Sequence, residues 1–150
     1  MGKIIELNFE DIIPNQKSLI PNKIENFLRS YLENSDKKVI VPVVPWSKAP
    51  FKKSLIDGHH RVAGLYLLHK MDEKYKIYGW LAEDKHDLVK ILPEEFYQEV
   101  TSLKKSNFEI KERFNYAKNC PYMNLEELIN QYLYMNSVQT MLKRFNLVLK

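Results

Sequence analysis

The stretch Ser54–Leu68, with the sequence SLIDGHHRVAGLYLL, changes from apolar to polar and back to apolar. Leu55 and Ile56 predict the end of a short strand. A polar corner follows at residues 57–61, and residues 62–68 are apolar on most sides, which is typical of a buried helix. Gly58 allows the backbone to turn sharply or to approach a ligand closely. The stretch therefore predicts a strand–corner–helix unit around which the rest of the chain is organised.

The corner itself carries side chains suited to binding an anion. Asp57, His59, His60 and Arg61 supply an acid, two imidazoles and a guanidinium within five residues. The first turn of a helix adds free N–H groups and a partial positive charge. A structural interpretation also stands, in which Asp57 caps the helix, Gly58 serves the turn and the basic side chains face water.

The corner and the residues before it resemble the ParB-like and sulfiredoxin-like superfamily. The sequence DGHHR, followed by an apolar helix that contains alanine, resembles the superfamily's phosphate-binding box. Residues 12–16 resemble its first proline-containing loop, residues 24–32 its first helix, and residues 41–44 its "P-I-V-V" strand. The resemblance covers roughly residues 3–83. It implies an α+β fold in which helices pack on a small mixed sheet.

The periodicity of the chain predicts a core at residues 1–83 and a helical C-terminal extension at 84–150, packed together as one domain. Strands are predicted at 3–7, 38–44, 51–56 and 75–81, with Pro42 at an edge or a bulge. A helix is predicted at 23–33, begun by Asn22 and Glu25 as a capping box. Further helices are predicted from Pro93, at 108–116, from Asn124 and at 137–149. The last two are either a helix-turn-helix or one longer helix.

Composition sets broad limits on function. The chain has 150 residues, of which 45% are hydrophobic and 28% charged, as in a soluble globular protein. Its 23 basic and 19 acidic residues are spread evenly, which is weak evidence for a nucleic-acid-binding face. Cys120 is the only cysteine, so an intramolecular disulfide and a cysteine-rich zinc site are excluded. The sequence shows no signal-peptide core and no run long enough for a membrane helix, so a cytoplasmic protein without a membrane partner is expected.

Single residues separate the activities within the superfamily. Sulfiredoxins carry a reactive cysteine after the box glycine, where this chain has His59. Partition proteins carry an arginine-rich box for cytidine triphosphate, and here the box has Arg61 alone. The free serine kinases share the DGHHR form most closely, but they use a glutamate of the first loop as a base. The matching loop here offers Asn15, Gln16 and Lys17, so no catalytic base is assigned from the resemblance.

The resemblance implies that the chain binds a nucleoside di- or triphosphate of the ATP, ADP or CTP type, together with Mg²⁺. Phosphoryl transfer or nucleotide hydrolysis is the implied chemistry, with Asp57 and His60 as catalytic residues. Asp57 would hold the nucleotide–metal assembly, and the basic groups would offset charge on the phosphates. The predicted nucleotide- and phosphate-binding residues are Gly58, His59, His60, Arg61, Gln16 and Lys17.

Two functions of other classes remain open from the sequence. One is a DNA-binding or nuclease-like module of the plasmid or phage type, and the other is a non-catalytic protein-interaction domain whose DGHHR corner is structural. A protein-bound metal site is not predicted. Asp57, His59, His60 and His69 lack the spacing of four residues that places two histidines on one helix face.

Overall fold

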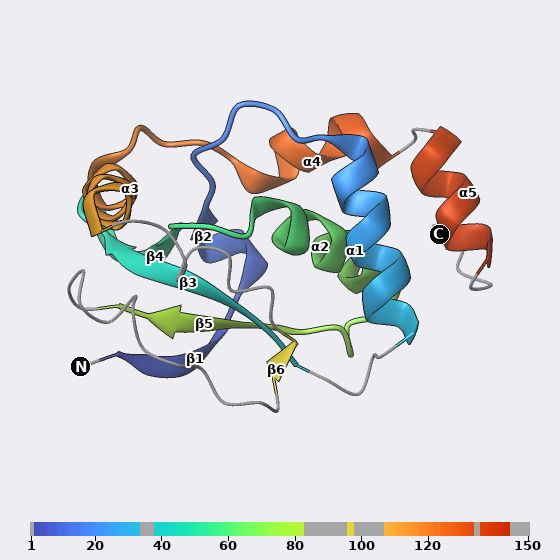
Figure 1. Ribbon diagram of the computed structural model, residues 1–150, viewed down its shortest axis with the longest axis horizontal. Helices are drawn as coiled ribbons and strands as arrows, with labels where there is room; N and C mark the ends of the chain where they lie inside the picture. Colours follow the sequence, from blue (N-terminus) through green and yellow to red (C-terminus); the bar gives the residue numbers. More distant parts are fainter. Residues whose placement is uncertain (1, 34–37, 83–95, 98–106, 134–135, 145–150) are drawn as a thin grey trace.

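The computed structural model describes residues 2–33, 38–82, 96–97, 107–133 and 136–144 (Figure 1). In chain order the elements are β1 (Lys3–Leu7), a 3-10 helix η1 (Phe9–Asp11), β2 (Ile12–Ile13), α1 (Pro21–Glu33), β3 (Lys38–Trp46), β4 (Ala49–Leu55), α2 (His59–Met71), β5 (Ile77–Leu81), β6 (Phe96–Tyr97), α3 (Asn107–Asn119), α4 (Leu125–Leu133) and α5 (Asn136–Arg144).

The strands form a mixed sheet in the order β1-β5-β3-β4-β2, and β6 pairs with β3 off this path. The β1–β5 and β3–β4 pairs are antiparallel, whereas β3–β5, β2–β4 and β3–β6 are parallel. The predicted α+β class with a small mixed sheet is confirmed. The strands predicted at 3–7, 38–44, 51–56 and 75–81 correspond to β1, β3, β4 and β5.

Strand β3 lies in the middle of the sheet and is buried on both faces. Val39, Val41 and Val43 belong to the main hydrophobic cluster, beneath α1 and α2. Val44 lies on the other face, in a cluster that includes residues of α3. A strand covered on both faces needs apolar side chains at successive positions, which explains the unbroken apolar run of β3.

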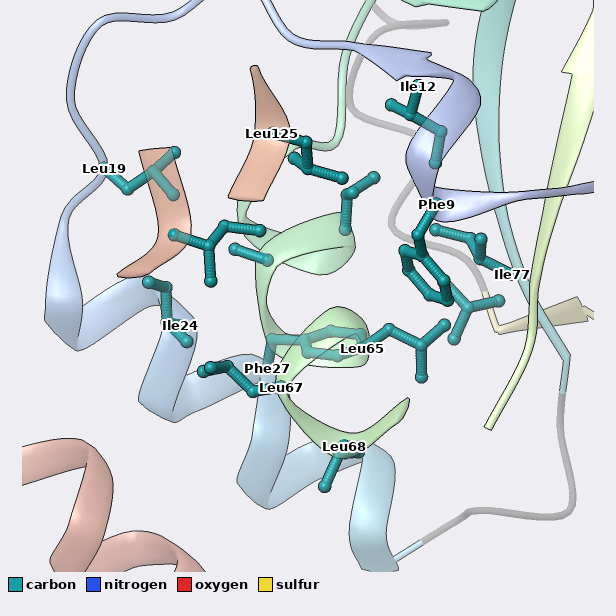
Figure 2. Packing of buried hydrophobic residues seen from close by; sticks show 14 of the residues in the cluster. Phe9, Ile12, Leu19, Ile24, Phe27, Leu65, Leu67, Leu68, Ile77 and Leu125 are labelled. Carbon is teal, nitrogen blue, oxygen red and sulfur yellow. The ribbon is translucent and has the colours of Figure 1, made fainter. Parts of the chain in front are cut away.

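The main core forms between the sheet and the helices α1, α2 and α4. Figure 2 shows Ile24 and Phe27 of α1 directed toward α2, which carries Leu65, Leu67 and Leu68. The predicted apolar stripe of α1 is therefore core, with Ile24 and Leu28 fully buried. The N-terminal end of α2 is fixed by this packing, and the corner at residues 57–61 is fixed with it.

Pro42 is accommodated in a way that the sequence did not predict, because β3 is central and its register shift lies between Pro45 and Trp46. The last registered pair between β3 and β4 is Val43 with Leu55, so Pro42 lies just beyond it. Its carbonyl oxygen accepts a hydrogen bond of 3.0 Å from the N–H of Ile56. The missing N–H of proline therefore falls where the β3–β4 ladder has ended.

Two predicted helix starts are also corrected. Helix α1 begins at Pro21, so Asn22 is its second residue and not its N-cap. Proline is favoured at the first helical position, because its missing N–H has no intrahelical partner there. The helix predicted from Pro93 falls partly on residues 93–95, which lie outside the described residues, and the next two residues form β6 instead.

The C-terminal helices pack on both sides of the sheet. Phe114 and Ala117 of α3 bury against Val44 and Ile56, on the face opposite α1 and α2. Helix α4 has the predicted N-cap, because Asn124 Oδ1 accepts the N–H of Glu127 at 3.0 Å. Helix α5 is drawn as a separate helix beside α1 (Figure 1). Among the helices that are described, none is long and apolar enough to span a membrane.

Candidate functional site

The predicted strand–corner–helix unit is present: β4 ends at Leu55 and α2 begins at His59. Gly58 is the N-cap residue of α2 and has a φ of 92°, in the left-handed region that favours glycine. Because glycine has no side chain, Gly58 makes no side-chain capping hydrogen bond to α2. Asp57 Oδ1 accepts the N–H of Gly58 at 2.8 Å, so the interpretation of Asp57 as the helix cap is wrong.

Close packing explains why the corner residue is glycine. A Cβ atom on Gly58 would lie 2.6 Å from Cγ1 of Val41 and 3.0 Å from Nη2 of Arg61. The Arg61 guanidinium thus lies directly against the corner backbone. Arg61 is only 9% exposed, and its Nη1 donates a hydrogen bond of 3.2 Å to the carbonyl oxygen of Ile40. The buried guanidinium joins the first turn of α2 to the central strand.

Both corner histidines hold the loop that precedes α1. Nε2 of His59 accepts the backbone N–H of Asn15 at 3.0 Å, and Nε2 of His60 accepts that of Ile20 at 2.9 Å. An accepting Nε2 carries no hydrogen, so each neutral ring keeps its proton on Nδ1. The side chain of Asn15 also holds this loop against the end of β4, because its Nδ2 donates to the carbonyl oxygen of Leu55 at 2.7 Å.

Burial keeps these imidazoles neutral. Loss of water contact lowers the pKa of His59 from its usual 6.5 to about 4, and the Asp57 carboxylate only partly opposes this shift. Burial also lowers the pKa of His60, and the nearby Lys23 ammonium lowers it further. At neutral pH the two rings therefore contribute no positive charge to the corner. The positive charge there comes from Arg61, Lys23 and Arg113, together with the N-terminus of α2.

Two cavities open on either side of the corner. The first, which we call the α1 cavity, has a volume of about 380 Å³ and lies between α1 and the start of α2. It is lined by Gln16, Lys23, Asn26, Phe27, Ser30, Asp57, Gly58, His59, His60 and Arg61. The second, the α3 cavity, has a volume of about 690 Å³ and is lined by Asn15, Gln16, Ile56, Asp57, His59, Glu112, Arg113, Asn115 and Tyr116.

The two cavities share Gln16, Asp57 and His59, so they meet at the corner. Asp57 stands between them, and its Oδ1 lies 3.6 Å from Nη1 of Arg113 on α3. Each volume falls within the range of small-molecule sites in proteins, about 300–1,000 Å³. The arrangement offers a basic recess at the helix N-terminus next to a wider, more open recess beside α3.

Most of the predicted site residues come together here. Gly58, His60 and Arg61 line the α1 cavity, and Gln16 lines both cavities. Lys17 is exposed and is not among the residues that line either cavity. The predicted roles of these residues in phosphate binding and catalysis stay predictions.

Sequence reasoning missed the contributions of α1 and α3. Lys23, Asn26 and Ser30 recur at spacings of three and four residues along α1, so the helical period placed them together on one face. That face could have been recognised as polar. No signal in the sequence indicated that Glu112 and Tyr116 of α3 would lie beside the corner, since that depends on which sheet face α3 covers.

The other histidine and cysteine of the described chain lie apart from the corner. His69 lies near the far end of α2, where Nδ1 is 2.8 Å from the carbonyl oxygen of Tyr75. Cys120 is buried, with Sγ 3.4 Å from Oγ of Ser54. Across the described ranges, no three His, Cys, Asp or Glu side chains come together as a metal-binding group. Comparisons with protein-family models, with curated proteins and with solved structures give no match to this chain.

Proposed function

We propose that this chain binds a nucleoside di- or triphosphate, with the phosphates in the α1 cavity and the nucleoside in the α3 cavity. The observation that carries this proposal is the junction of the two cavities at the start of α2. A basic recess on one side suits the phosphates, and an open recess with an exposed tyrosine suits a sugar and a base.

The α1 cavity supports phosphate binding through three independent groups. The first-turn N–H groups of α2 begin after Gly58, which provides no side-chain cap. Arg61 lines the cavity and adds a guanidinium charge, which the hydrogen bond from Nη1 to the carbonyl oxygen of Ile40 holds in place. Lys23 of α1 adds an ammonium group close enough to His60 to lower the pKa of that imidazole. The only carboxylate among the lining residues of this cavity is that of Asp57.

Asp57 also fits a role beside a magnesium ion. Mg²⁺ is commonly bound by one or two carboxylates together with substrate phosphates and water. A single carboxylate at the junction of the cavities matches that pattern, whereas a protein-only metal cage does not form among the described residues. The ion would offset charge on the phosphates, and Asp57 and Arg61 would fix the orientation of the bound group.

Asp57 is the best candidate for a base if phosphoryl transfer takes place. Its carboxylate lines both cavities and so borders the proposed phosphate site, whereas Glu112 lines only the α3 cavity. It would accept the proton of a water or hydroxyl whose oxygen attacks the terminal phosphorus. The bond from that phosphorus to the bridging oxygen breaks, and the shorter nucleotide leaves.

Titration calorimetry with ATP, ADP, CTP and pyrophosphate, with and without Mg²⁺, tests the binding proposal. Lys23→Gln should lower the affinity for the nucleotides and for pyrophosphate about tenfold. This is the lower end of the range for charge-assisted hydrogen bonds. Tyr116→Leu should lower the affinity for the nucleotides and leave the affinity for pyrophosphate unchanged, because the substitution removes a stacking surface but no charge. Lys74→Gln, at an exposed lysine of the turn before β5, is the matched control and should change nothing.

Failure of the wild-type chain to bind any of these ligands would overturn the proposal. Equal effects of Lys23→Gln and Lys74→Gln would show that the lysine acts only through net charge. Asp57→Asn tests the chemistry separately: nucleotide binding without Mg²⁺ should persist while phosphate release or transfer is lost. Glu127→Gln on α4 is its control, and equal rates in both variants would remove Asp57 from the mechanism.

A further inference from the structure

A second surface, away from the corner, combines exposed aromatic rings with lysines at the β3–β4 hairpin. Phe51 and Tyr122 are 67% and 57% exposed, which is unusual for side chains of this size. The lysines around them are Lys48, Lys52 and Lys118. We call this set the hairpin patch: Trp46, Lys48, Phe51, Lys52, Lys118 and Tyr122.

Short distances connect Lys48 with Trp46 and Tyr122, and Lys52 with Phe51. Nζ of Lys48 lies 5.5 Å from the ring centroid of Trp46, whose centroid lies 6.1 Å from that of Tyr122. Lys52 lines a small pocket together with Tyr122, and its Nζ lies 5.6 Å from the ring centroid of Phe51. The backbone of Lys118 is adjacent to the turn, because its carbonyl oxygen accepts the N–H of Ser47 at 2.9 Å.

The rings differ in what they can do. Trp46 is buried, and its Nε1 donates to the carbonyl oxygen of Cys120 at 2.9 Å, so it supports the hairpin from beneath. Phe51 and Tyr122 project into water without covering the core. Such rings, spaced between lysines, offer π-faces to planar partners and cations to the charges that accompany them.

The charge around the patch favours an anionic partner. Glu10 and Glu126 line the small pocket beside Lys52, but Glu126 is paired with Lys70 at 3.0 Å. Lys53 is left out of the patch because Asp11 is near it and its Nζ donates to the carbonyl oxygen of Pro50. Lys48 and Lys118 are exposed, so the three lysines of the patch outweigh the one remaining carboxylate.

We propose that the hairpin patch binds single-stranded nucleic acid, with bases stacked on Phe51 and Tyr122 and the phosphate backbone held by Lys48, Lys52 and Lys118. Single strands are favoured over duplex because only unstacked bases can lie flat on exposed rings. The surface is distinct from the two cavities at the corner, so this binding does not depend on the proposed nucleotide site.

Fluorescence anisotropy with a labelled eight-nucleotide single strand, as DNA and as RNA, tests the proposal. If three lysines contact phosphates, a plot of the logarithm of the association constant against the logarithm of the salt concentration should have a slope of about −2. Lys48→Gln/Lys52→Gln should reduce this slope by about 1.4. Phe51→Leu and Tyr122→Leu keep apolar volume but remove the π-face, and each should weaken binding at least about fivefold with the slope unchanged.

Controls separate the hairpin patch from the corner and from net charge. The double variant Lys74→Gln/Lys143→Gln removes two positive charges, as Lys48→Gln/Lys52→Gln does, but from exposed lysines outside the hairpin patch. It should keep most of the affinity for the oligonucleotide. Tyr116→Leu and saturating ATP should have no effect on oligonucleotide binding. Each of three results would overturn the proposal: no binding by the wild-type chain at 20 mM salt, equal losses in the patch and control lysine pairs, or competition by ATP.

The duplex form and anionic membranes provide the remaining comparisons. The same oligonucleotide annealed to its complement should bind more weakly and should not respond to Phe51→Leu. Equal binding of duplex and single strand would contradict base stacking. Binding of phosphatidylserine vesicles without binding of any oligonucleotide would assign the patch to a membrane surface and would overturn the proposal.

Discussion

Nε2 of His59 lies 3.0 Å from the backbone nitrogen of Asn15 and accepts its N–H, which joins the first turn of α2 to the loop before α1. His60 makes the equivalent contact with Ile20, so two adjacent imidazoles anchor one loop at two points. Both contacts require an unprotonated Nε2. The loop supplies Gln16 to both cavities, so the two histidine contacts hold a lining residue of the site in place.

The stability of the protein should depend on pH through His59. Its pKa is about 4 in the folded chain and about 6.5 when unfolded, so only the unfolded chain binds the proton between these values. Stability is therefore complete above pH 6.5 and is lost as pH falls toward 4. Between pH 7.5 and 5 this residue should remove about 2 kcal/mol from the free energy of unfolding, measured by urea denaturation.

His59→Gln provides the comparison for this pH effect. Glutamine offers an oxygen acceptor to the Asn15 N–H but does not titrate, so its unfolding free energy should change less over the same interval. The lowered pKa of His60 acts in the same direction and leaves a smaller slope in the variant. Parallel curves for the wild type and His59→Gln would refute the assignment of the slope to His59.

Replacement of Gly58 should be strongly destabilising for two separable reasons. Gly58→Ala must adopt a φ of 92°, and its Cβ would meet Cγ1 of Val41 at 2.6 Å. Strain and overpacking together should cost about 2–4 kcal/mol of unfolding free energy. In a double-mutant cycle, Val41→Ala should recover the steric part only. A purely additive cycle would show that the contact with Val41 contributes nothing.

Tyr132 should stabilise the same loop from the opposite side. Its hydroxyl oxygen accepts the N–H of Leu19 at 2.7 Å and donates to the carbonyl oxygen of Leu19 at 2.8 Å, and all these groups are buried. Tyr132→Phe leaves both backbone groups without their hydroxyl partner, which should cost at least about 2 kcal/mol in chemical denaturation. Tyr122→Phe, on a 57% exposed ring, should change stability by less than about 0.5 kcal/mol.

Cys120 should be dispensable for ligand binding. Its thiol is buried beneath β4, beside Ser54, and lines neither cavity. Cys120→Ala should reduce stability by about 1 kcal/mol through a small cavity and leave nucleotide affinity unchanged.

Because His59 occupies the position after the corner glycine, the wild-type chain should also fail to reduce an overoxidised peroxiredoxin with ATP. Reduction that disappeared in Cys120→Ala would contradict this prediction.

The sequence predicted the elements where the local pattern and the tertiary environment agree. The nearly continuous β-branched run of residues 38–44 identified β3, and the stripe from Ile24 to Leu32 identified the buried side of α1. Asn124 was recognised as a cap because its contact is made within its own helix. Two predictions were wrong. Pro42 lies in a central strand and not at an edge or a bulge, and Asn22 is not the N-cap because α1 begins at Pro21.

The sequence by itself determined the corner, because Gly58, the polar run around it and the apolar helix that follows are local features with local physical causes. It also placed Gln16 in the loop that borders the site. Only the tertiary structure decided what surrounds the corner. The packing of α1 on α2 brought Lys23 to the α1 cavity, and the burial of Phe114 on the opposite sheet face brought Glu112 and Tyr116 to the α3 cavity. Those contacts depend on which faces of the sheet the helices cover, and side-chain periodicity along one segment does not encode that choice.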